Sequence, residues 1–149
     1  MKGFTLIELM VTIVVLALLL TIGIPSFTAI IRDSRLTAQS NELLGSMIAA
    51  SSEAANRNQP VRITAAAAGW AAGWELRNLD DDVLRSYRAL RGNNLLTCAG
   101  DCDEVIFLGS GSAYAAATFT LCDQGGEHGR IIKVLNSGKA RISDGGDEC

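Results

Sequence analysis

The first part of the chain is an almost unbroken apolar run. Between Phe4 and Ile24 the only charged residue is Glu8. As an α-helix this run is about 31 Å long, which matches the hydrocarbon core of a bilayer. We therefore expect residues 4–25 to form an apolar helix that crosses a membrane or packs inside an assembly. Pro25 lacks a backbone donor and is expected to kink the helix at its end.

The pattern becomes amphipathic over residues 26–57. Apolar residues recur at steps of three and four, which predicts one buried helical face; these residues are Leu36, Leu43, Leu44, Met47, Ile48 and Ala54. Gln39 and Glu42 are expected on the opposite, exposed face. Pro60 disfavours helical angles at the residue before it, so the helix should end there.

Residues 58–149 show short β-type runs separated by Gly, Asn and Asp. The expected strands are Val61–Thr64, Gly73–Arg77, Leu84–Arg91, Glu104–Leu108, Thr118–Cys122, Arg130–Leu135 and Lys139–Ile142. Residues 65–68 form either a hairpin tip or a short helix. The fold class is therefore α+β, with the amphipathic helix packed on an antiparallel β-sheet. Trp70 and Trp74 are expected to pack between strand and helix.

Glu8 is the residue that the apolar pattern does not explain. A charge at the centre of a bilayer costs about 3 kcal/mol on insertion scales, so it usually has a partner or a function. An ordinary membrane anchor accounts for the length of the run but not for Glu8. A cleaved secretory signal would need a small-x-small site after the run, which Ile24-Pro25-Ser26 does not provide. A carboxylate that simply reaches the headgroups is the remaining alternative.

The segment Gly3-Phe4-Thr5-Leu6-Ile7-Glu8 resembles the prepilin signal shared by type IV pilins and type II secretion pseudopilins. The resemblance covers residues 3–25 and implies cleavage between Gly3 and Phe4, followed by N-methylation of Phe4. It also implies that Glu8 pairs with the Phe4 amine of a neighbouring subunit, which offsets the desolvation of both charges. The leader, residues 1–3, is short, so an upstream start codon is an open alternative.

This resemblance also implies partners and a location. The partners would be major and minor pilins, together with the prepilin peptidase and methylase. The subunit would first cross the inner membrane once, with its C-terminal domain in the periplasm. On assembly into a pilus or pseudopilus, residues 4–25 would pack in the filament core.

Composition agrees with an exported domain. The 149 residues include 13 basic and 16 acidic side chains, and this net charge of −3 does not mark a nucleic-acid binder. Cys98, Cys102, Cys122 and Cys149 suggest disulfides, with three pairings open to four cysteines. We favour Cys98–Cys102 and Cys122–Cys149. Zinc is the alternative, although the only histidine is His128.

The downstream sequence resembles the GspH/FimT family of minor pilins and minor pseudopilins. The resemblance is carried by short segments in a common order, which are Ser52-Glu53-Ala54, Arg57-Asn58-Gln59-Pro60-Val61, Trp70, Gly73-Trp74, Phe119-Thr120-Leu121-Cys122-Asp123, Gly129-Arg130 and Gly138-Lys139-Ala140-Arg141. The family implies a low-abundance subunit that assembles with other minor pilins, often at the filament tip.

Catalytic motifs are weak in this sequence. Ser110, His128 and Asp123 can be written as a triad, but no pattern positions them. Gly109-x-Gly111 lacks the Gly-Lys-Ser/Thr of a phosphate loop, and the aspartates at 80–82 lack the spacing of a calcium loop. We therefore expect a protein without catalytic residues, cofactor or metal.

Basic residues form two groups, Arg77, Arg85, Arg88 and Arg91 in the middle and Arg130, Lys133, Lys139 and Arg141 near the end. In the FimT branch a Gly-Arg-x-Arg motif is implicated in DNA binding during natural transformation, and Gly138-Lys139-Ala140-Arg141 looks like it. Lysine keeps the charge but loses the two-pronged phosphate contact. The acidic residues at 144, 147 and 148 would repel DNA, and an ordinary solvated strand edge is the alternative.

These observations lead to one main hypothesis and two alternatives. The main hypothesis is a minor pilin that takes part in type IV pilus assembly, with DNA as a candidate additional ligand. The first alternative is a minor pseudopilin of type II secretion, which would need no basic surface. The second is a DNA receptor whose main task is binding, for which Lys139 and Arg141 would be essential.

Overall fold

The computed structural model describes residues 3–100, 102–126, 128–145 and 149. The first two residues of the expected leader and residues 146–148 of the acidic tail lie outside this part, as do the side chains of residues 22–26, including Pro25. The chain divides into two compact units, residues 1–34 and residues 35–149. Within the described residues, no helix has both the length and the hydropathy needed to cross a bilayer.

The chain begins with the long helix α1 (Leu6–Arg57), which continues past Pro25. A Schellman motif closes its C-terminal end, because Asn58 N–H donates to the Ala55 carbonyl and Gln59 N–H to the Ala54 carbonyl, both at 3.2 Å. Asn58 adopts a left-handed φ of 50°, which asparagine tolerates better than most residues. The helix thus ends just before Pro60, as the sequence predicts.

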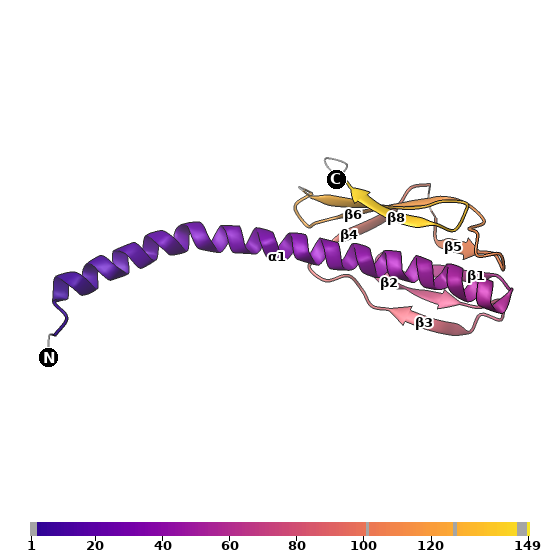
Figure 1. Cartoon of the computed structure of the whole chain (residues 1–149), viewed down its shortest axis with the longest axis horizontal. Helices are drawn as coiled ribbons and strands as arrows, with labels where there is room; N and C mark the ends of the chain where they lie inside the picture. Colours follow the sequence, from indigo (N-terminus) through magenta and orange to yellow (C-terminus); the bar gives the residue numbers. More distant parts are fainter. Residues whose placement is uncertain (1–2, 101, 127, 146–148) are drawn as a thin grey trace. The chain divides into compact units, whose positions relative to one another are not determined.

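Eight strands follow in the described chain: β1 (Val61–Ala66), β2 (Gly69–Arg77), β3 (Val83–Tyr87), β4 (Leu95–Cys98), β5 (Glu104–Phe107), β6 (Ala117–Cys122), β7 (Gly129–Val134) and β8 (Ala140–Asp144). They form two antiparallel sheets, the first in the order β3-β2-β1-β5 and the second in the order β4-β6-β7-β8. In Figure 1 the second half of α1 crosses in front of both sheets, with β6 and β8 on one side and β2 and β3 on the other.

The α+β class is confirmed, but several strand assignments need correction, among them β2, which begins at Gly69 and not at Gly73. Two sheets are present where one was expected, and β4 was missed because its sequence, Leu95-Leu96-Thr97-Cys98, does not alternate between apolar and polar residues. The strand expected over Leu84–Arg91 ends at Tyr87, although Leu90 N–H still donates to the Ala71 carbonyl of β2 at 2.9 Å. Residues 67–68 are the tip of the β1–β2 hairpin, not a helix.

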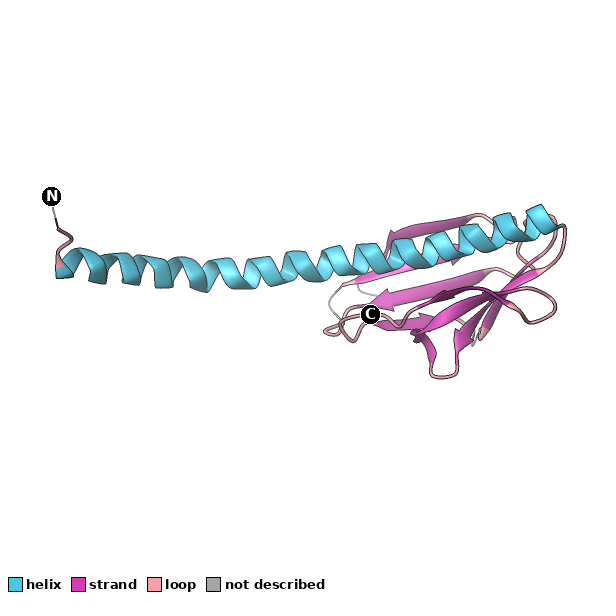
Figure 2. Ribbon diagram, turned by 90° about the horizontal axis from the view of Figure 1, so that it is seen from below, coloured by secondary structure: helices cyan, strands magenta, loops and turns pink. Residues whose placement is uncertain are grey.

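The core lies where residues 35–57 of α1 meet the two sheets (Figure 2). The helix contributes a stripe with spacings of three, four and seven, whose members are Leu36, Leu43, Met47, Ala50 and Ala54, each at most 1% exposed. Phe107 from the first sheet and Phe119 and Ile132 from the second are fully buried against the same cluster. One apolar helix face therefore holds both sheets together.

Both tryptophans lie in this core, as expected from the sequence. The Trp74 indole N–H donates to the Ser46 hydroxyl on α1 at 3.0 Å, and Ser46 donates to the Leu43 carbonyl at 2.7 Å. The Trp70 indole N–H donates to the Cys102 carbonyl at 2.7 Å, while its ring meets Phe119 edge to face. Each large ring thus has its polar atom satisfied, which burial requires.

Two residues of α1 contradict the helical faces inferred from the sequence. Ile48 was expected in the core but is 50% exposed, because it lies beside the stripe that Leu43 and Met47 define. Gln39 was expected on the exposed face but is buried. Asn94 donates to its side-chain oxygen at 2.6 Å, so the buried amide has a hydrogen-bond partner. A partner more than fifty residues away in sequence thus satisfies a polar group that periodicity assigns to solvent.

This difference between neighbouring apolar residues predicts different losses of stability. Leu43→Ala should lower the free energy of unfolding by about 2–5 kcal/mol, because it leaves a cavity in the core. Ile48→Ala should cost about 0.5 kcal/mol, as expected for surface changes. Urea unfolding of the full chain in a mild detergent, followed by tryptophan fluorescence, measures both. Equal losses would contradict the placement of Ile48 outside the core.

Candidate functional site

The N-terminal end of α1 is built by two residues that cap each other. Thr5 precedes the helix, and its hydroxyl accepts the Glu8 N–H at 3.3 Å. The Glu8 carboxylate in turn accepts the Thr5 N–H and the Thr5 hydroxyl, both at 3.4 Å. This is a capping box, with Thr5 at the N-cap and Glu8 at the third helical position. The spacing Thr-x-x-Glu in the sequence is the signal for this capping box, in addition to the assembly role expected for Glu8.

The capping box points the Glu8 carboxylate towards the preceding residues. Phe4, the expected new N-terminus, is bonded directly to Thr5 and is 81% exposed. The three hydrogen bonds within the box are longer than the usual range and are therefore weak. A cationic amine could replace them with a shorter, charge-assisted bond. The fold thus orients the Glu8 carboxylate, but the hydrogen bonds that it accepts are weak.

The helix surface beyond Glu8 is apolar and exposed. Every large apolar side chain described from Leu6 to Leu20 is at least 49% exposed. Thr12 and Thr21 donate their hydroxyls to carbonyls of their own helix, those of Leu9 and Leu18, each at 2.7 Å. The polar atoms of these threonines are therefore satisfied locally. An exposed apolar area of this size marks a surface that another molecule covers.

The cysteines of the second unit form two disulfides, Cys98–Cys102 and Cys122–Cys149. The second ties the last residue of the chain to β6 across a separation of 27 residues. Where the structure describes the chain, no group of three or more His, Cys, Asp or Glu side chains could hold a metal ion. The four cysteines therefore staple the β-rich unit.

Two residues of the Ser110, His128 and Asp123 triad, Asp123 and His128, meet in one turn. Asp123 closes the turn before β7, since its N–H donates to the His128 carbonyl at 3.0 Å and its carboxylate accepts the His128 N–H at 3.3 Å. The His128 ring is 4.0 Å from the same carboxylate. Ser110 lies in another turn and shares a hydrogen bond of 2.6 Å with Ser112.

The four basic residues expected to bind DNA fall on two faces of the second sheet. Lys133 on β7 and Arg141 on β8 are directly opposite each other, so their side chains share one face. Leu135 N–H donates to the Lys139 carbonyl at 2.9 Å, so Leu135 and Lys139 continue the β7–β8 register. Lys139 therefore lies on the same face as Lys133 and Arg141. Arg130 belongs to the other face, where it pairs with Asp144 at 3.3 Å. The structure thus brings together three of the four residues.

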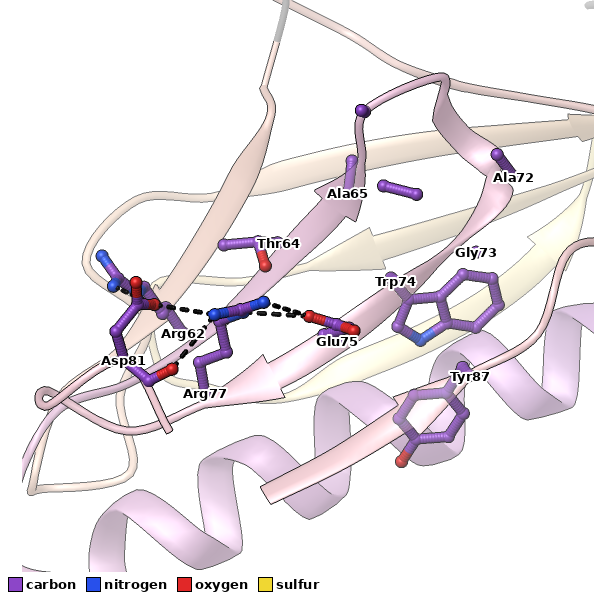
Figure 3. Close-up of a pocket in the computed structure, with 12 residues that line it drawn as sticks. Arg62, Thr64, Ala65, Ala72, Gly73, Trp74, Glu75, Arg77, Asp81 and Tyr87 are labelled. Atoms are coloured by element: carbon purple, nitrogen blue, oxygen red, sulfur yellow. Dashed lines mark hydrogen bonds and ion pairs between the residues drawn. The ribbon is translucent and has the colours of Figure 1, made fainter. Parts of the chain in front are cut away.

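The central arginines separate in a similar way. Figure 3 shows Arg77 between Glu75 and Asp81, with Arg62 on the other side of Asp81. Asp81 accepts hydrogen bonds from Arg62 at 2.7 Å and Arg77 at 3.1 Å, and these bonds lower the pKa of its carboxyl. The bond to Glu75, followed by that to Asp81, raises the pKa of Arg77. Arg77 is therefore neutralised locally, and only Arg85, Arg88 and Arg91 remain of the central group.

Two family models match this chain. The model of the type II transport protein GspH matches residues 39–138, and the model of the prokaryotic N-terminal methylation motif matches residues 1–24. The chain belongs to the GspH family. Together the two matches cover the N-terminal segment and most of the β-rich unit of this GspH-family chain. No curated protein sequence matches it at a significant level.

Solved structures share the fold of this GspH-family chain. The type IV minor pilin FimU of Pseudomonas aeruginosa superimposes with a TM-score of 0.64 at 20% identity, over 78% of this chain and 92% of that one. The minor pseudopilin EpsH from the type 2 secretion system of Vibrio cholerae gives 0.60 at 11% identity, over 74% and 97%. The GspH-family chain is therefore a pilin-like subunit of the minor pilin and pseudopilin class.

Proposed function

We propose that this chain is a minor pilin of a type IV pilus, processed between Gly3 and Phe4 and inserted into the filament or its tip complex. One observation carries the proposal. A capped but weakly bonded Glu8 begins a helix whose apolar side chains are exposed from Leu6 to Leu20. Before assembly the inner membrane would cover this surface, and after assembly the helices of neighbouring pilins would.

The same geometry supports a pairing of Glu8 with the N-terminus of a neighbouring subunit. Cleavage after Gly3 would create a positive amine at Phe4 in each subunit. An apolar filament core solvates neither charge well, so a pair between subunits is favoured over two isolated charges. The weak bonds from Thr5 leave the carboxylate available for this exchange.

A second candidate function is that of a minor pseudopilin in type II secretion. It is favoured by the family model, whose description is that of a type II transport protein. The same processing and the same Glu8 pairing would apply. The difference lies in the assembly partners, and neighbouring genes for pilus assembly or for secretion would separate the two.

DNA binding is a candidate addition to the pilin role. Lys133 and Arg141 lie directly opposite each other, where like charges repel, and neither has an ion pair among the residues that the structure describes. Thr118, the β6 neighbour of Lys133, adds a hydroxyl to this face. A phosphate backbone would relieve the repulsion between the two cations and would bind in a salt-dependent manner.

Replacing Glu8 with glutamine tests the assembly role. Glutamine also serves at the third position of a capping box, so the helix end is kept while the charge is lost. We expect incorporation into sheared filaments to fall by about tenfold or more, because a charge-assisted bond is lost. The chain should remain in the membrane fraction. Glu53→Gln, which removes an exposed charge paired with Arg57, is the matched control. Normal incorporation of the Glu8 variant would refute the role.

The basic face is tested by DNA binding of the full chain in detergent, titrated against salt. Lys139→Ala with Arg141→Ala should weaken binding and lower the salt slope by about two, because two phosphate contacts are lost. The matched control is Arg88→Ala with Arg91→Ala, which removes the same charge from the segment that follows β3. Equal effects of the two pairs would show that only net charge matters. Full binding by the Lys139/Arg141 variant would exclude the site.

A further inference from the structure

A basic groove lies within the second unit, between α1 and the segment that follows β3. Its volume is about 570 Å³. The α1 wall carries Arg35, Ala38, Gln39 and Glu42, and the opposite wall is formed by residues 86–91. This groove is separate from the β7–β8 face on which Lys133 and Arg141 lie.

The groove has an excess of positive charge. Arg35, Arg88 and Arg91 line it, and Glu42 is the one acidic residue among its lining side chains. No ion pair involves any of these three arginines in the described part of the chain. Arg77, in contrast, is held by Glu75 and Asp81. Three guanidinium groups without an ion pair therefore line the same groove, and their positive charge attracts an anionic ligand.

Buried contacts hold the wall that carries Arg88 and Arg91. The Gln39 amide donates to the Arg91 carbonyl at 2.9 Å, and Asn94 donates to Gln39 at 2.6 Å. Gln39 and Asn94 are 7% and 8% exposed. These bonds fix the backbone that presents the arginines, so little ordering is needed when a ligand binds.

Gly92 shapes the end of the same wall. Its φ is 82°, and a Cβ there would lie 2.1 Å from an Arg35 guanidinium nitrogen. The absent side chain thus lets the Arg35 guanidinium lie directly on the turn after Arg91. The contact brings an arginine of α1 to the arginine-bearing segment.

We propose that this groove binds an acidic segment of a neighbouring filament subunit. Arginine pairs with carboxylates through two parallel hydrogen bonds, and the apolar lining of Ala38, Ala89 and Leu90 suits a peptide. Glu42 in the groove disfavours a continuous polyanion but can pair with a basic residue of a mixed-charge peptide. Among the described residues of β7 and β8 the one acid, Asp144, pairs with Arg130 on the face opposite Lys133 and Arg141, so nucleic acid fits the Lys133 and Arg141 face better. The inference rests on the proposed role as a filament subunit.

The test is a fluorescence anisotropy titration of the full chain in nonionic detergent with a labelled acidic peptide of five glutamates and one lysine, because the lysine can pair with Glu42. Arg88→Gln with Arg91→Gln should weaken binding by about tenfold or more, since two charge-assisted contacts are lost. Lys133→Gln with Arg141→Gln makes the same charge change on the other face and should have less than about a twofold effect. The variant with Arg88→Lys and Arg91→Lys should bind the peptide with intermediate affinity, because lysine keeps the charge but cannot make two parallel hydrogen bonds to a carboxylate.

Three outcomes would overturn the proposal. Unchanged peptide binding by the Arg88/Arg91 variant, or equal losses in both glutamine pairs, would exclude a specific site. A parallel titration with a short duplex DNA tests whether the groove binds the phosphate groups of nucleic acid instead of the carboxylates of a peptide. DNA binding that depends on Arg88 and Arg91 more strongly than peptide binding does would make the groove a nucleic-acid site instead. Because no filament is needed, a negative result leaves the Glu8 experiment unaffected.

Discussion

The cost of an unpaired carboxylate in apolar surroundings is the constraint on which this account depends. Glu8 lies at the start of an exposed apolar helix, where neither lipid nor packed helices would solvate its charge. The capping box with Thr5 orients the carboxylate but contributes only long hydrogen bonds. In the proposed assembly, a positive partner from a neighbouring subunit would offset this cost. A local feature of one helix end thus favours assembly.

The second unit presents a folded surface to partners at the other end of the chain. A single apolar stripe of α1 holds two sheets, and two disulfides staple the loops and the last residue. On this support the unpaired cations gather in two places, the β7–β8 face and the groove beside β3. Their surroundings differ, because an acid and apolar residues line the groove while a threonine flanks the strand face. This difference suggests two ligands of different chemistry.

Local patterns in the sequence predicted the local features well. The extent of α1, its end before Pro60 and the buried tryptophans follow from periodicity, capping and residue size. The width of the buried helix face could not be predicted in this way. Residue spacing alone does not show that Ile48 lies at the edge of this face, where half of it is exposed. Gln39 was misplaced for a related reason, as its partner Asn94 is distant in sequence.

Long-range pairing accounts for what the sequence could not reveal about the sites. Arg130 and Lys133 are close in sequence, but the β7–β8 register places them on opposite faces. The central arginines looked like one cluster, and only the fold assigns Arg77 to its acidic neighbours and Arg88 to the groove with Arg35. The capping box of Thr5 and Glu8, in contrast, is a local feature that the spacing Thr-x-x-Glu predicts.

The most direct measurement is the intact mass and N-terminal peptide of the mature chain, isolated from membranes and filaments of cells that process prepilins. The account predicts a chain that begins at Phe4 and carries one added methyl group on its amine. Such a terminus would supply the positive partner that Glu8 requires. A mature chain that retains residues 1–3, or one cleaved after the apolar run, would contradict the account, because no Phe4 amine would then exist to pair with the carboxylate.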